Sequence, residues 1–208
     1  MKQYKVYLLD FDGTIADSLE SIVEPYVEAF KKVGVTLQKE DVEDAIHHSV
    51  GQTLEKHHVS DPNDIRQFLE TFFYYFETDE NIKKVKIYAE VPSFLEKGKQ
   101  NGVIFGVVSG NAVSHIKHVL TLFGLDKYFS FYIGGEPDRK PKPYLDPLFA
   151  AFEYVKDVSK EDIVYVGDSL QDIESAKNAS IDGILVERKG EYPQISATKI
   201  RVLDELFL

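Results

Sequence analysis

The sequence of 208 residues contains no cysteine, which excludes disulfide bonds, thiolate metal ligands and cysteine nucleophiles. It has no run of 18 apolar residues, so we expect no transmembrane helix. Basic residues are few, since 24 Lys and Arg stand against 35 Asp and Glu, for a formal net charge of −11. This balance argues against nonspecific binding to nucleic acid or to an anionic membrane. The N-terminal segment has no cleavage site typical of a signal peptide, so we expect a cytoplasmic protein.

Short apolar segments rich in β-forming residues recur along the chain, and most of them end in Gly, Ser or Asp. Each is too short for a helix, and near-continuous apolar runs are typical of parallel strands covered on both faces. Helical patterns lie at 91–101, at 113–123 and after Asp146-Pro147, where Asp146 would cap the helix. This alternation predicts an α/β fold with a Rossmann-like parallel sheet flanked by helices. The expected strands are residues 4–10, 103–108, 129–133, 163–166 and 183–186.

Residues 18–82 interrupt this alternation and are predicted to form a small all-helical domain inserted after the first strand. Apolar residues repeat at helical spacing from Leu19 to Val33, and again from Ile65 to Phe76. Shorter helices are expected at 39–48 and 51–58. The predicted division is an α/β core of residues 1–17 and 83–208 and a helical cap of residues 18–82, with hinges at 15–18 and 82–88.

The first helix of this insertion carries two local signals. Asp17, followed three residues later by Glu20, predicts a capping pair at the start of the helix. Pro25 lies inside the helical pattern, and an interior proline costs about 3 kcal/mol. We therefore expect a kink or a break at Pro25.

Acidic residues follow two of the predicted strands. Asp10 and Asp12 belong to DFDGT, directly after the first strand, while Asp168 follows the strand at 163–166. Ligands of parallel α/β sheets bind beyond the carboxyl ends of the strands. Clustered carboxylates repel one another, and a hard divalent cation with oxygen ligands relieves that repulsion. The sequence therefore predicts a Mg²⁺ site at this edge of the sheet.

Two further segments carry groups suited to an anion. Ser109, Gly110 and Asn111 precede a predicted helix, and a hydroxyl together with the free N–H groups of a helix start forms an anion site. The basic segment RKPKP at 139–143 follows another strand, and its prolines hold it extended. A carboxylate nucleophile, a second carboxylate, a divalent metal, a hydroxyl and a lysine are the groups that phosphoryl transfer needs.

These motifs resemble the haloacid dehalogenase-like hydrolase superfamily. DFDGT (10–14), the serine of VVSGN (107–111), the lysine of KPKP (140–143) and GDSLQD (167–172) occur in the order that the family shows. The helical insertion directly after the first motif is similar to the alpha-helical cap of that family. It places the chain near phosphoglycolate phosphatase-like and β-phosphoglucomutase-like members.

The resemblance implies a role for each aspartate. Asp10 would attack phosphorus and form an aspartyl-phosphate, and Asp12 would protonate the leaving alcohol and then deprotonate the attacking water. An aspartate at position 12 favours phosphate esters as substrates, because the dehalogenase members lack it. Mg²⁺ would be held by Asp10, by the backbone carbonyl of Asp12 and by Asp168. Asp172 would orient the metal site without binding the metal.

The resemblance also assigns the phosphate contacts. Ser109 would donate a hydrogen bond to a phosphoryl oxygen, with Gly110 in the same loop, and Thr14 would steady the first motif. Lys140, which precedes P-x-P, would neutralise both the phosphate and the nucleophile. Lys142 is the alternative, because the lysine-proline pair occurs twice.

The helical cap is expected to select the substrate, with His47, Gly51 and Gln52 as candidates for substrate contact. Adjacent histidines occur at 47–48 and at 57–58. Because neighbouring residues point about 100° apart on a helix, such a pair does not face one ion, and we expect no metal site there.

Three interpretations of the function are open. A Mg²⁺-dependent phosphatase acting on a small organic phosphate is favoured, and a phosphomutase would use the same aspartyl-phosphate but return it to a bound sugar phosphate. A non-catalytic module that binds a phosphate ligand is the least favoured, because the catalytic positions are filled. The expected partner is a small phosphorylated metabolite and neither nucleic acid nor a membrane, while monomer and homodimer stay open.

Overall fold

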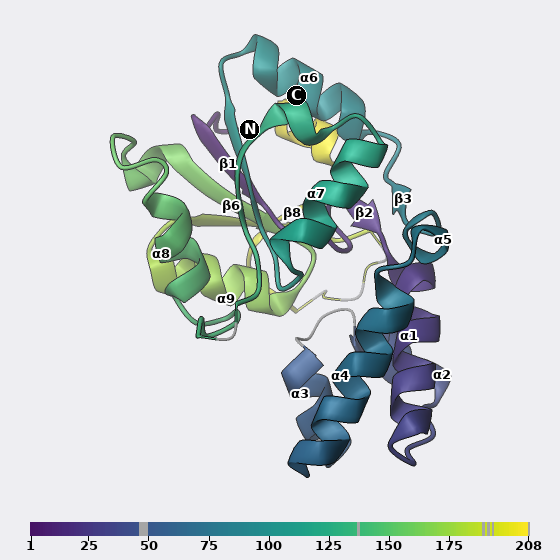
Figure 1. Ribbon diagram of the computed structural model, residues 1–208. Coiled ribbons are helices and arrows are strands. Elements are labelled where there is room, and N and C mark those ends of the chain that lie inside the picture. The colour runs from purple at the N-terminus through teal and green to yellow at the C-terminus, as the bar shows by residue number, and fades with distance from the viewer. Residues whose placement is uncertain (46–49, 137, 189, 191, 193, 208) are drawn as a thin grey trace. The chain divides into compact units, whose positions relative to one another are not determined.

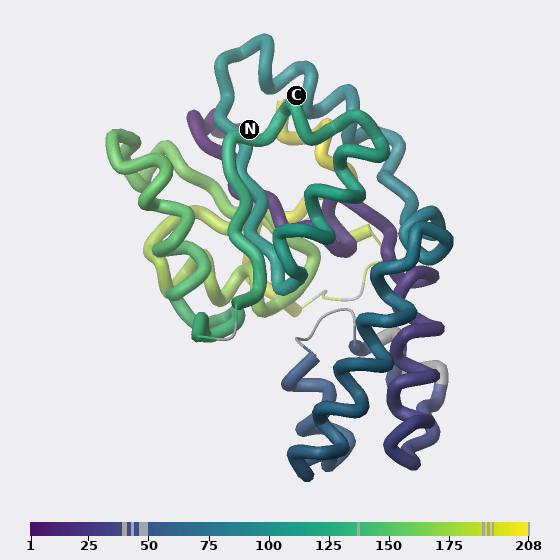
Figure 2. The backbone as a smooth tube through the Cα atoms, viewed as in Figure 1, coloured from purple at the N-terminus to yellow at the C-terminus, as the bar shows by residue number. Residues whose placement is uncertain are grey.

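The computed structural model describes residues 1–45, 50–136, 138–188, 190, 192 and 194–207, with only the backbone of residues 39, 40 and 43. The chain divides into two compact units, which we call the core unit, residues 1–16 and 87–208, and the helical unit, residues 17–86. Figures 1 and 2 trace the chain through both units.

A six-stranded sheet forms the centre of the core unit, in the order β5-β4-β1-β6-β7-β8, and all neighbouring strands are parallel. This arrangement confirms the predicted Rossmann-like sheet. Because β1 lies between β4 and β6, the segments that follow these three strands meet at one edge. The strands are β1 (Val6–Leu9), β4 (Ile104–Val108), β5 (Phe129–Ile133), β6 (Ile163–Gly167), β7 (Asp182–Val186) and β8 (Thr198–Ile200). The helices are α6 (Val91–Gln100), α7 (Val113–Leu122), α8 (Asp146–Phe152) and α9 (Leu170–Ala179), with short 3-10 helices η1 (Asp126–Tyr128), η2 (Lys160–Asp162) and η3 (Leu203–Phe207).

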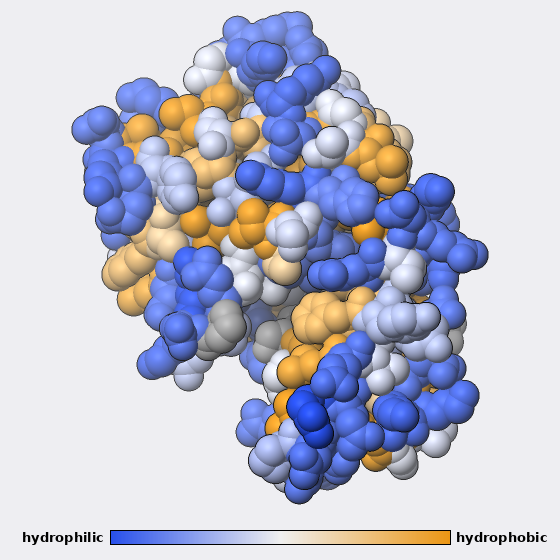
Figure 3. All heavy atoms as spheres, in the orientation of Figure 1, coloured by the Kyte–Doolittle hydropathy of each residue, from blue (hydrophilic) through white to orange (hydrophobic). Residues whose placement is uncertain are grey.

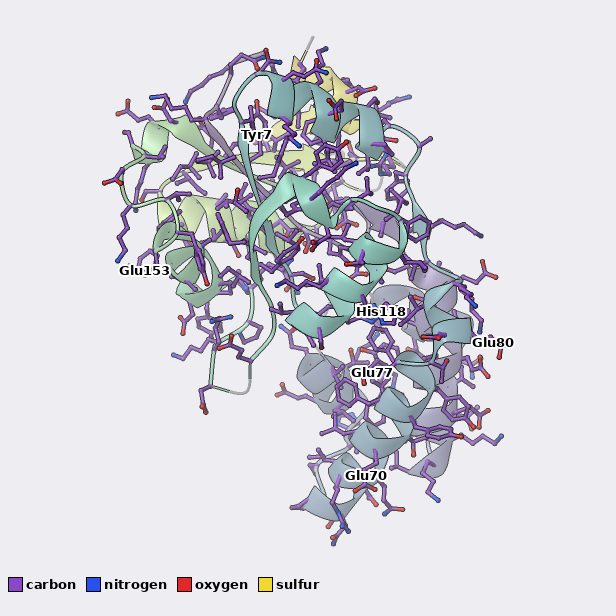
Figure 4. The ribbon with its side chains drawn as sticks, turned by 45° about the horizontal axis from the view of Figure 1, so that its top comes forward. Tyr7, Glu70, Glu77, Glu80, His118 and Glu153 are labelled. Atoms are coloured by element: carbon purple, nitrogen blue, oxygen red, sulfur yellow. The ribbon has the colours of Figure 1, made fainter. Side chains whose placement is uncertain are left out.

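Successive residues of β1 face opposite sides of the sheet, and each side is covered by helices. Val6 and Leu8 are buried in one cluster with apolar residues of α8 and α9. Tyr7, labelled in Figure 4, faces the other side, where its ring lies 6.1 Å from that of Phe94 in α6. Figure 1 shows α6 and α7 on one side of the sheet and α8 and α9 on the other. The strand order, with β4 and β5 on one side of β1 and β6, β7 and β8 on the other, is consistent with this arrangement, because parallel crossovers are nearly always right-handed.

Some elements of the core unit differ from the sequence-based expectation. Leu145, not Asp146, is the residue that precedes α8, so Asp146 lies in the first turn and caps nothing with its side chain. The short strand β8 and the helix η3 were not predicted, because three or five residues carry too little periodicity. Phe207 of η3 packs against Tyr7, with ring centroids 5.5 Å apart, so this C-terminal segment completes the core.

The helical unit has a core of aromatic side chains from its two long helices. The rings of Phe30 and Phe68 lie 4.7 Å apart, and those of Tyr26 and Phe72 lie 4.9 Å apart. Such contacts supply most of the apolar burial of a small helical unit. The helices are α1 (Leu19–Lys32), α2 (Lys39–Ala45), α3 (Val50–Lys56), α4 (Pro62–Phe76) and α5 (Asp79–Ile82). The end of the helix expected at 39–48, with His47 and His48, lies outside the described residues.

The break that was one of the two expectations at Pro25 does not occur. The helix α1 continues through Pro25, and the Ser21 carbonyl, four residues earlier, accepts a hydrogen bond of 2.6 Å from the side-chain amide of Asn81. The predicted capping pair is also absent: Ser18 is the N-cap and makes no side-chain capping bond. Glu20 instead pairs with Lys86 at 2.8 Å, which takes its carboxylate away from the helix start.

The helical unit begins one residue before and ends four residues after the expected range of 18–82. Lys84 and Lys86 pair with Glu24 and Glu20 of α1, each at 2.8 Å, which attaches residues 83–86 to this unit. The chain leaves the core at β2 (Ala16–Asp17) and returns at β3 (Lys86–Ile87), and these two strands form a small sheet of their own.

Polar side chains cover much of the visible surface in Figure 3, with apolar residues exposed between them. Figure 4 labels Glu70, Glu77 and Glu80, which are exposed acidic residues of the helical unit. In the part of the chain that the structure describes, none of the helices combines the length and the apolar character needed to span a membrane.

Candidate active site

A tight turn after β1 carries the first acidic motif. Asp10 begins the turn, and its N–H donates to the carbonyl of Val166 in β6 at 2.9 Å. Gly13 has a φ of +72°, and a Cβ at this position would lie 1.8 Å from Oδ2 of Asp168. Only glycine fits this combination of backbone conformation and close approach. The turn after β1 and the end of β6 are therefore in direct contact.

Asp10 is buried and faces a cation. Its Oδ1 lies 2.9 Å from Nζ of Lys142, and the Lys142 side chain is itself only 13% exposed. Burial, together with the charges of Asp172 and Asp12, raises the pKa of Asp10 to about 7, and the Lys142 ammonium opposes this rise. Burial disfavours the ammonium of Lys142. The carboxylates of Asp10 and Asp172 outweigh this effect and hold the pKa of Lys142 well above its usual value.

The lysine beside Asp10 is Lys142, whereas the sequence favoured Lys140. Lys140 is exposed, and its ammonium lies 5.1 Å from the centre of the Tyr144 ring. Each of the two lysines precedes a proline, and the P-x-P pattern that favoured Lys140 does not decide which lysine reaches Asp10, because the path of the segment selects it. Arg139 helps to set that path, because its guanidinium donates to the Gly134 carbonyl at 2.7 Å.

Asp172 is fully engaged with protein groups. Its Oδ1 accepts hydrogen bonds from Nζ of Lys142 at 2.7 Å and from the hydroxyl of Tyr165 at 2.9 Å. Its Oδ2 accepts from the N–H and the hydroxyl of Ser169 at 3.0 and 2.6 Å. Burial opposes the charge of Asp172, but Lys142 and Ser169 outweigh it and lower its pKa. This arrangement fits a carboxylate that positions Lys142, and it involves Tyr165, which the sequence did not single out.

Three carboxylates gather at this edge of the sheet. Asp10, Asp168 and Asp172 each offer an oxygen within 4.8 Å of the others. Burial, followed by the charges of Asp10 and Asp172, raises the pKa of Asp168 well above its usual value. A divalent cation would relieve this repulsion, and carboxylate oxygens are the ligands that Mg²⁺ prefers. Because both oxygens of Asp172 already accept hydrogen bonds, Asp10 and Asp168 are the side chains that fit a metal best.

Asp12 is held by a residue that the sequence left without a role. The side-chain amide of Asn111 donates to Oδ2 of Asp12 at 2.6 Å. This bond joins the turn after β1 to the segment after β4, and it aims the second carboxylate. Its geometry could not be read from the sequence, because the two residues are 99 positions apart.

The expected phosphate contacts lie close to these residues in the chain. Ser109 is buried at the end of β4, and its hydroxyl accepts a hydrogen bond of 3.2 Å from the N–H of Asn111. Gly110 is exposed, and nothing lies within 4 Å of a Cβ built there. Thr14 is fully buried, and its hydroxyl has no hydrogen-bond partner among the described residues.

The candidates for substrate contact belong to the helical unit. His47 lies outside the described residues, while Gly51 and Gln52 lie on α3, with Gly51 exposed. His57 packs its ring against Phe30 at 4.9 Å, and its Nε2 lies 3.8 Å from a carboxylate oxygen of Asp41. These contacts are internal to the unit and explain His57 as a structural residue.

The core unit is a Rossmann-like α/β fold with an acidic cluster at one edge of its sheet, and the helical unit is inserted in the sequence after the first strand. This combination is typical of one class of hydrolases. Residues 7–186 match the family model described as haloacid dehalogenase-like hydrolase. The chain therefore belongs to this family, which confirms the resemblance seen in the motifs and the prediction of a hydrolase.

Relatives in other organisms cover most of the chain. A protein of Caldanaerobacter subterraneus subsp. tengcongensis, whose name includes "pyrophosphatase PpaX", is 33% identical over 86% of this chain and 80% of its own length. A phosphoglycolate phosphatase of Nitrosococcus oceani is 26% identical over 86% of this chain and 82% of its own length. Among solved structures, a haloacid dehalogenase-like family hydrolase of Streptococcus pneumoniae superposes with a TM-score of 0.83 at 15% identity. That superposition covers 100% of this chain and 99% of the other, and it supports the fold alone.

Proposed function

We propose that the protein is a Mg²⁺-dependent phosphatase that hydrolyses a small organic phosphate monoester through an aspartyl-phosphate on Asp10. The observation that carries this proposal is the buried contact between Asp10 and Lys142, at 2.9 Å. A carboxylate at the end of the first strand with an ammonium beside it can receive a phosphoryl group and neutralise its oxygens. The relatives named phosphoglycolate phosphatase support the same reaction class.

In the first step the Asp10 carboxylate attacks phosphorus. A new bond forms between the Asp10 oxygen and phosphorus, and the bond from phosphorus to the alcohol oxygen breaks. Asp12, aimed by Asn111, gives its proton to the departing alcohol. Lys142 neutralises the phosphoryl oxygens, and the Ser109 hydroxyl donates a hydrogen bond to one of them.

In the second step water attacks the same phosphorus and releases inorganic phosphate. Asp12 now takes a proton from the water, and Asp10 leaves as a carboxylate. Asp172 keeps Lys142 in place throughout, because its Oδ1 holds the ammonium at 2.7 Å. Asp12 again carries a proton and Asp10 is again a carboxylate, so the enzyme has returned to its starting protonation state.

Asp10, Asp168 and the backbone carbonyl of Asp12 would hold Mg²⁺. When bound, the ion supplies positive charge that offsets the acidic cluster and the phosphoryl oxygens. The raised pKa values of Asp10 and Asp168 fit this role, because both carboxylates are buried and lie near other negative charges that a cation would offset.

Inorganic pyrophosphate is a second candidate substrate. The observation that favours it is the relative at 33% identity whose name includes "pyrophosphatase PpaX". The chemistry at Asp10 would be the same, with phosphate in place of the alcohol as leaving group. A panel containing both kinds of substrate separates the two candidates.

The test measures phosphate release from 2-phosphoglycolate, sugar phosphates, p-nitrophenyl phosphate and pyrophosphate, each with Mg²⁺. We expect release from at least one monoester, its loss on chelation, recovery with Mg²⁺ and poor recovery with Ca²⁺, whose looser geometry misaligns attack. Asp10→Asn should abolish turnover, while Asp157→Asn, at an exposed position, serves as the matched control. Release by Asp10→Asn above a tenth of the wild-type rate would contradict the nucleophile. Isomerisation of a sugar phosphate without release would favour a mutase.

A further inference from the structure

Arg188 lies two residues after β7 and reaches the turn that carries the two catalytic aspartates. Its Nε donates to the Gly13 carbonyl at 3.3 Å, and its Nη2 donates to the Thr14 carbonyl at 3.0 Å. Its Nη1 donates to the carbonyl of Arg201 at 3.3 Å. The Arg188 side chain is only 17% exposed, so these bonds form in a largely enclosed place.

The bonds of Arg188 add to the hydrogen bonding of this turn. The Phe11 carbonyl accepts from the N–H groups of Ile15 and Ala16, and the Ala16 carbonyl accepts from the N–H of Gly13. Between these backbone acceptors lie the carbonyls of Gly13 and Thr14, to which the guanidinium donates. Buried carbonyls need partners, so Arg188 meets a requirement of the turn that carries Asp10 and Asp12.

The same guanidinium holds the segment by which the chain returns from the helical unit. It lies 3.6 Å from the centre of the Tyr88 ring and pairs with the Glu90 carboxylate at 2.7 Å, and Glu90 is 13% exposed. The N–H of Tyr88 in turn donates to the Ile15 carbonyl at 3.2 Å. The guanidinium of Arg188 therefore contacts both the turn at 10–16, from which the chain enters the helical unit, and the segment at 87–90, by which it returns.

We propose that Arg188 is a positioning residue that ties the catalytic turn at 10–16 to the returning segment at 87–90. The expected effect of Arg188 on kcat rests on the proposed function. The contact between the turn and the returning segment can be tested by hydrogen exchange without any substrate. Arg188 would keep the carboxylates of Asp10 and Asp12 in line for attack by fixing the backbone directly behind them. It would also transmit movement of the returning segment to that backbone.

Lysine cannot replace arginine in this position. The planar guanidinium donates in three directions while its face lies on an aromatic ring, whereas an ammonium is a compact point charge. Arg188→Lys therefore keeps the charge near Glu90 and loses the simultaneous bonds to Gly13 and Thr14. The contrast separates a role in electrostatics from a role in geometry.

The first measurement is steady-state kinetics on p-nitrophenyl phosphate, at a temperature where circular dichroism shows each variant to be folded. We expect Arg188→Lys to lower kcat roughly tenfold and to leave KM within about twofold, because phosphate binding depends on Ser109 and Lys142. Arg66→Lys, at an exposed arginine of the helical unit with no role in the Arg188 contacts, is the matched control and should keep the wild-type kcat. A variant that was only less stable would show normal kcat while folded.

The second measurement is amide hydrogen exchange of the full chain without substrate. Arg188→Lys should speed exchange severalfold both in peptides covering 11–17 and in peptides covering 86–91, and Arg66→Lys should change neither. Glu90→Gln and Tyr88→Leu give the same readout if Arg188→Lys fails to fold. Unchanged exchange, or a change in one of the two segments only, overturns the proposal, and so does a kcat of Arg188→Lys within twofold of wild type. If the wild type cleaves no phosphate ester, the proposed function fails, and hydrogen exchange still decides the role of Arg188.

Discussion

The side-chain amide of Asn81 donates a hydrogen bond of 2.6 Å to the backbone carbonyl of Ser21, inside the helical unit. Ser21 lies four residues before Pro25, and this is the carbonyl that would accept the helical N–H that proline lacks. Asn81 is 3% exposed, and the same amide also donates to the Phe76 carbonyl at 3.2 Å. The side chain of α5 thus replaces a missing backbone donor in α1, which lets the helix continue through proline.

This relationship predicts a coupling between two substitutions. Asn81→Ala should lower the free energy of unfolding by about 1–3 kcal/mol, because it leaves a buried carbonyl without a donor. In a Pro25→Ala background the same change should cost less, since alanine returns a backbone N–H to Ser21. Denaturant unfolding of the four proteins measures the coupling energy. Asn101→Ala is the matched control, because Asn101 makes a similar bond to the Lys97 carbonyl at an exposed site. Equal costs in both backgrounds would refute the compensation.

The second prediction concerns the two lysines of the basic segment. Lys142→Met should lower kcat by about a thousandfold, because it removes the cation beside Asp10 and releases Asp172. Lys140→Met is the matched variant and should stay within about threefold of wild type, since Lys140 is exposed. Phosphate release under saturating substrate provides the measurement. The opposite ranking of the two variants would return the role to Lys140.

The third prediction tests Tyr165, whose hydroxyl lies 2.9 Å from Asp172 and 3.0 Å from the Val108 carbonyl. Tyr165→Phe keeps the ring and removes these bonds, so Asp172 should hold Lys142 less firmly. We expect kcat to fall about tenfold and stability to fall by about 1–2 kcal/mol. Tyr132→Phe removes a similar bond to Asp126, at 2.7 Å and away from the acidic edge. Tyr132→Phe should reduce stability without changing kcat. If both variants lost kcat equally, the result would argue against a role for Tyr165 in positioning Asp172 and Lys142.

The fourth prediction concerns stability at acidic pH. Burial, with a smaller contribution from His118, lowers the pKa of His115 from 6.5 to about 4. Between these two values the unfolded chain binds a proton that the folded chain does not, so stability falls as the pH falls from 6.5 to about 4. The loss from this residue should be roughly 2–3 kcal/mol.

Urea unfolding at a series of pH values measures this loss. His115→Leu should flatten the dependence between pH 6.5 and pH 4, whereas His118→Leu should change it much less, because His118 is exposed (labelled in Figure 4). A His115→Leu profile as steep as that of the wild type would show that other groups cause the acid sensitivity.

The sequence was sufficient to predict the order of elements and the residues at the strand ends. Short apolar runs separated by helical patterns specify a parallel sheet, and DFDGT marks the end of its first strand. The periodicity of α1 and α4 likewise predicts a helical insertion, because each helix carries an aromatic stripe that needs a partner.

Contacts between distant segments could not be predicted in the same way. Whether Lys140 or Lys142 reaches Asp10 depends on the path of one loop, which the sequence pattern that favoured Lys140 does not specify. The continuous α1 depends on Asn81, 60 residues after the carbonyl that it serves. The local rule correctly states that Pro25 cannot donate a backbone hydrogen bond. It does not take into account that a side chain distant in the sequence, here Asn81, can donate that bond instead.

The interleaving of the two units has a consequence for the growing chain. Synthesis proceeds from the N-terminus at roughly 5–20 residues per second, and domains fold as they emerge. The helical unit has its own buried cluster, and all of its residues have been made once residue 86 has left the ribosome. In contrast, β1 gains its second neighbour only when β6 (Ile163–Gly167) has been made. A nascent chain therefore carries Asp10 before Lys142 and Asp172 exist, and until β6 is made it also has an open edge on β1.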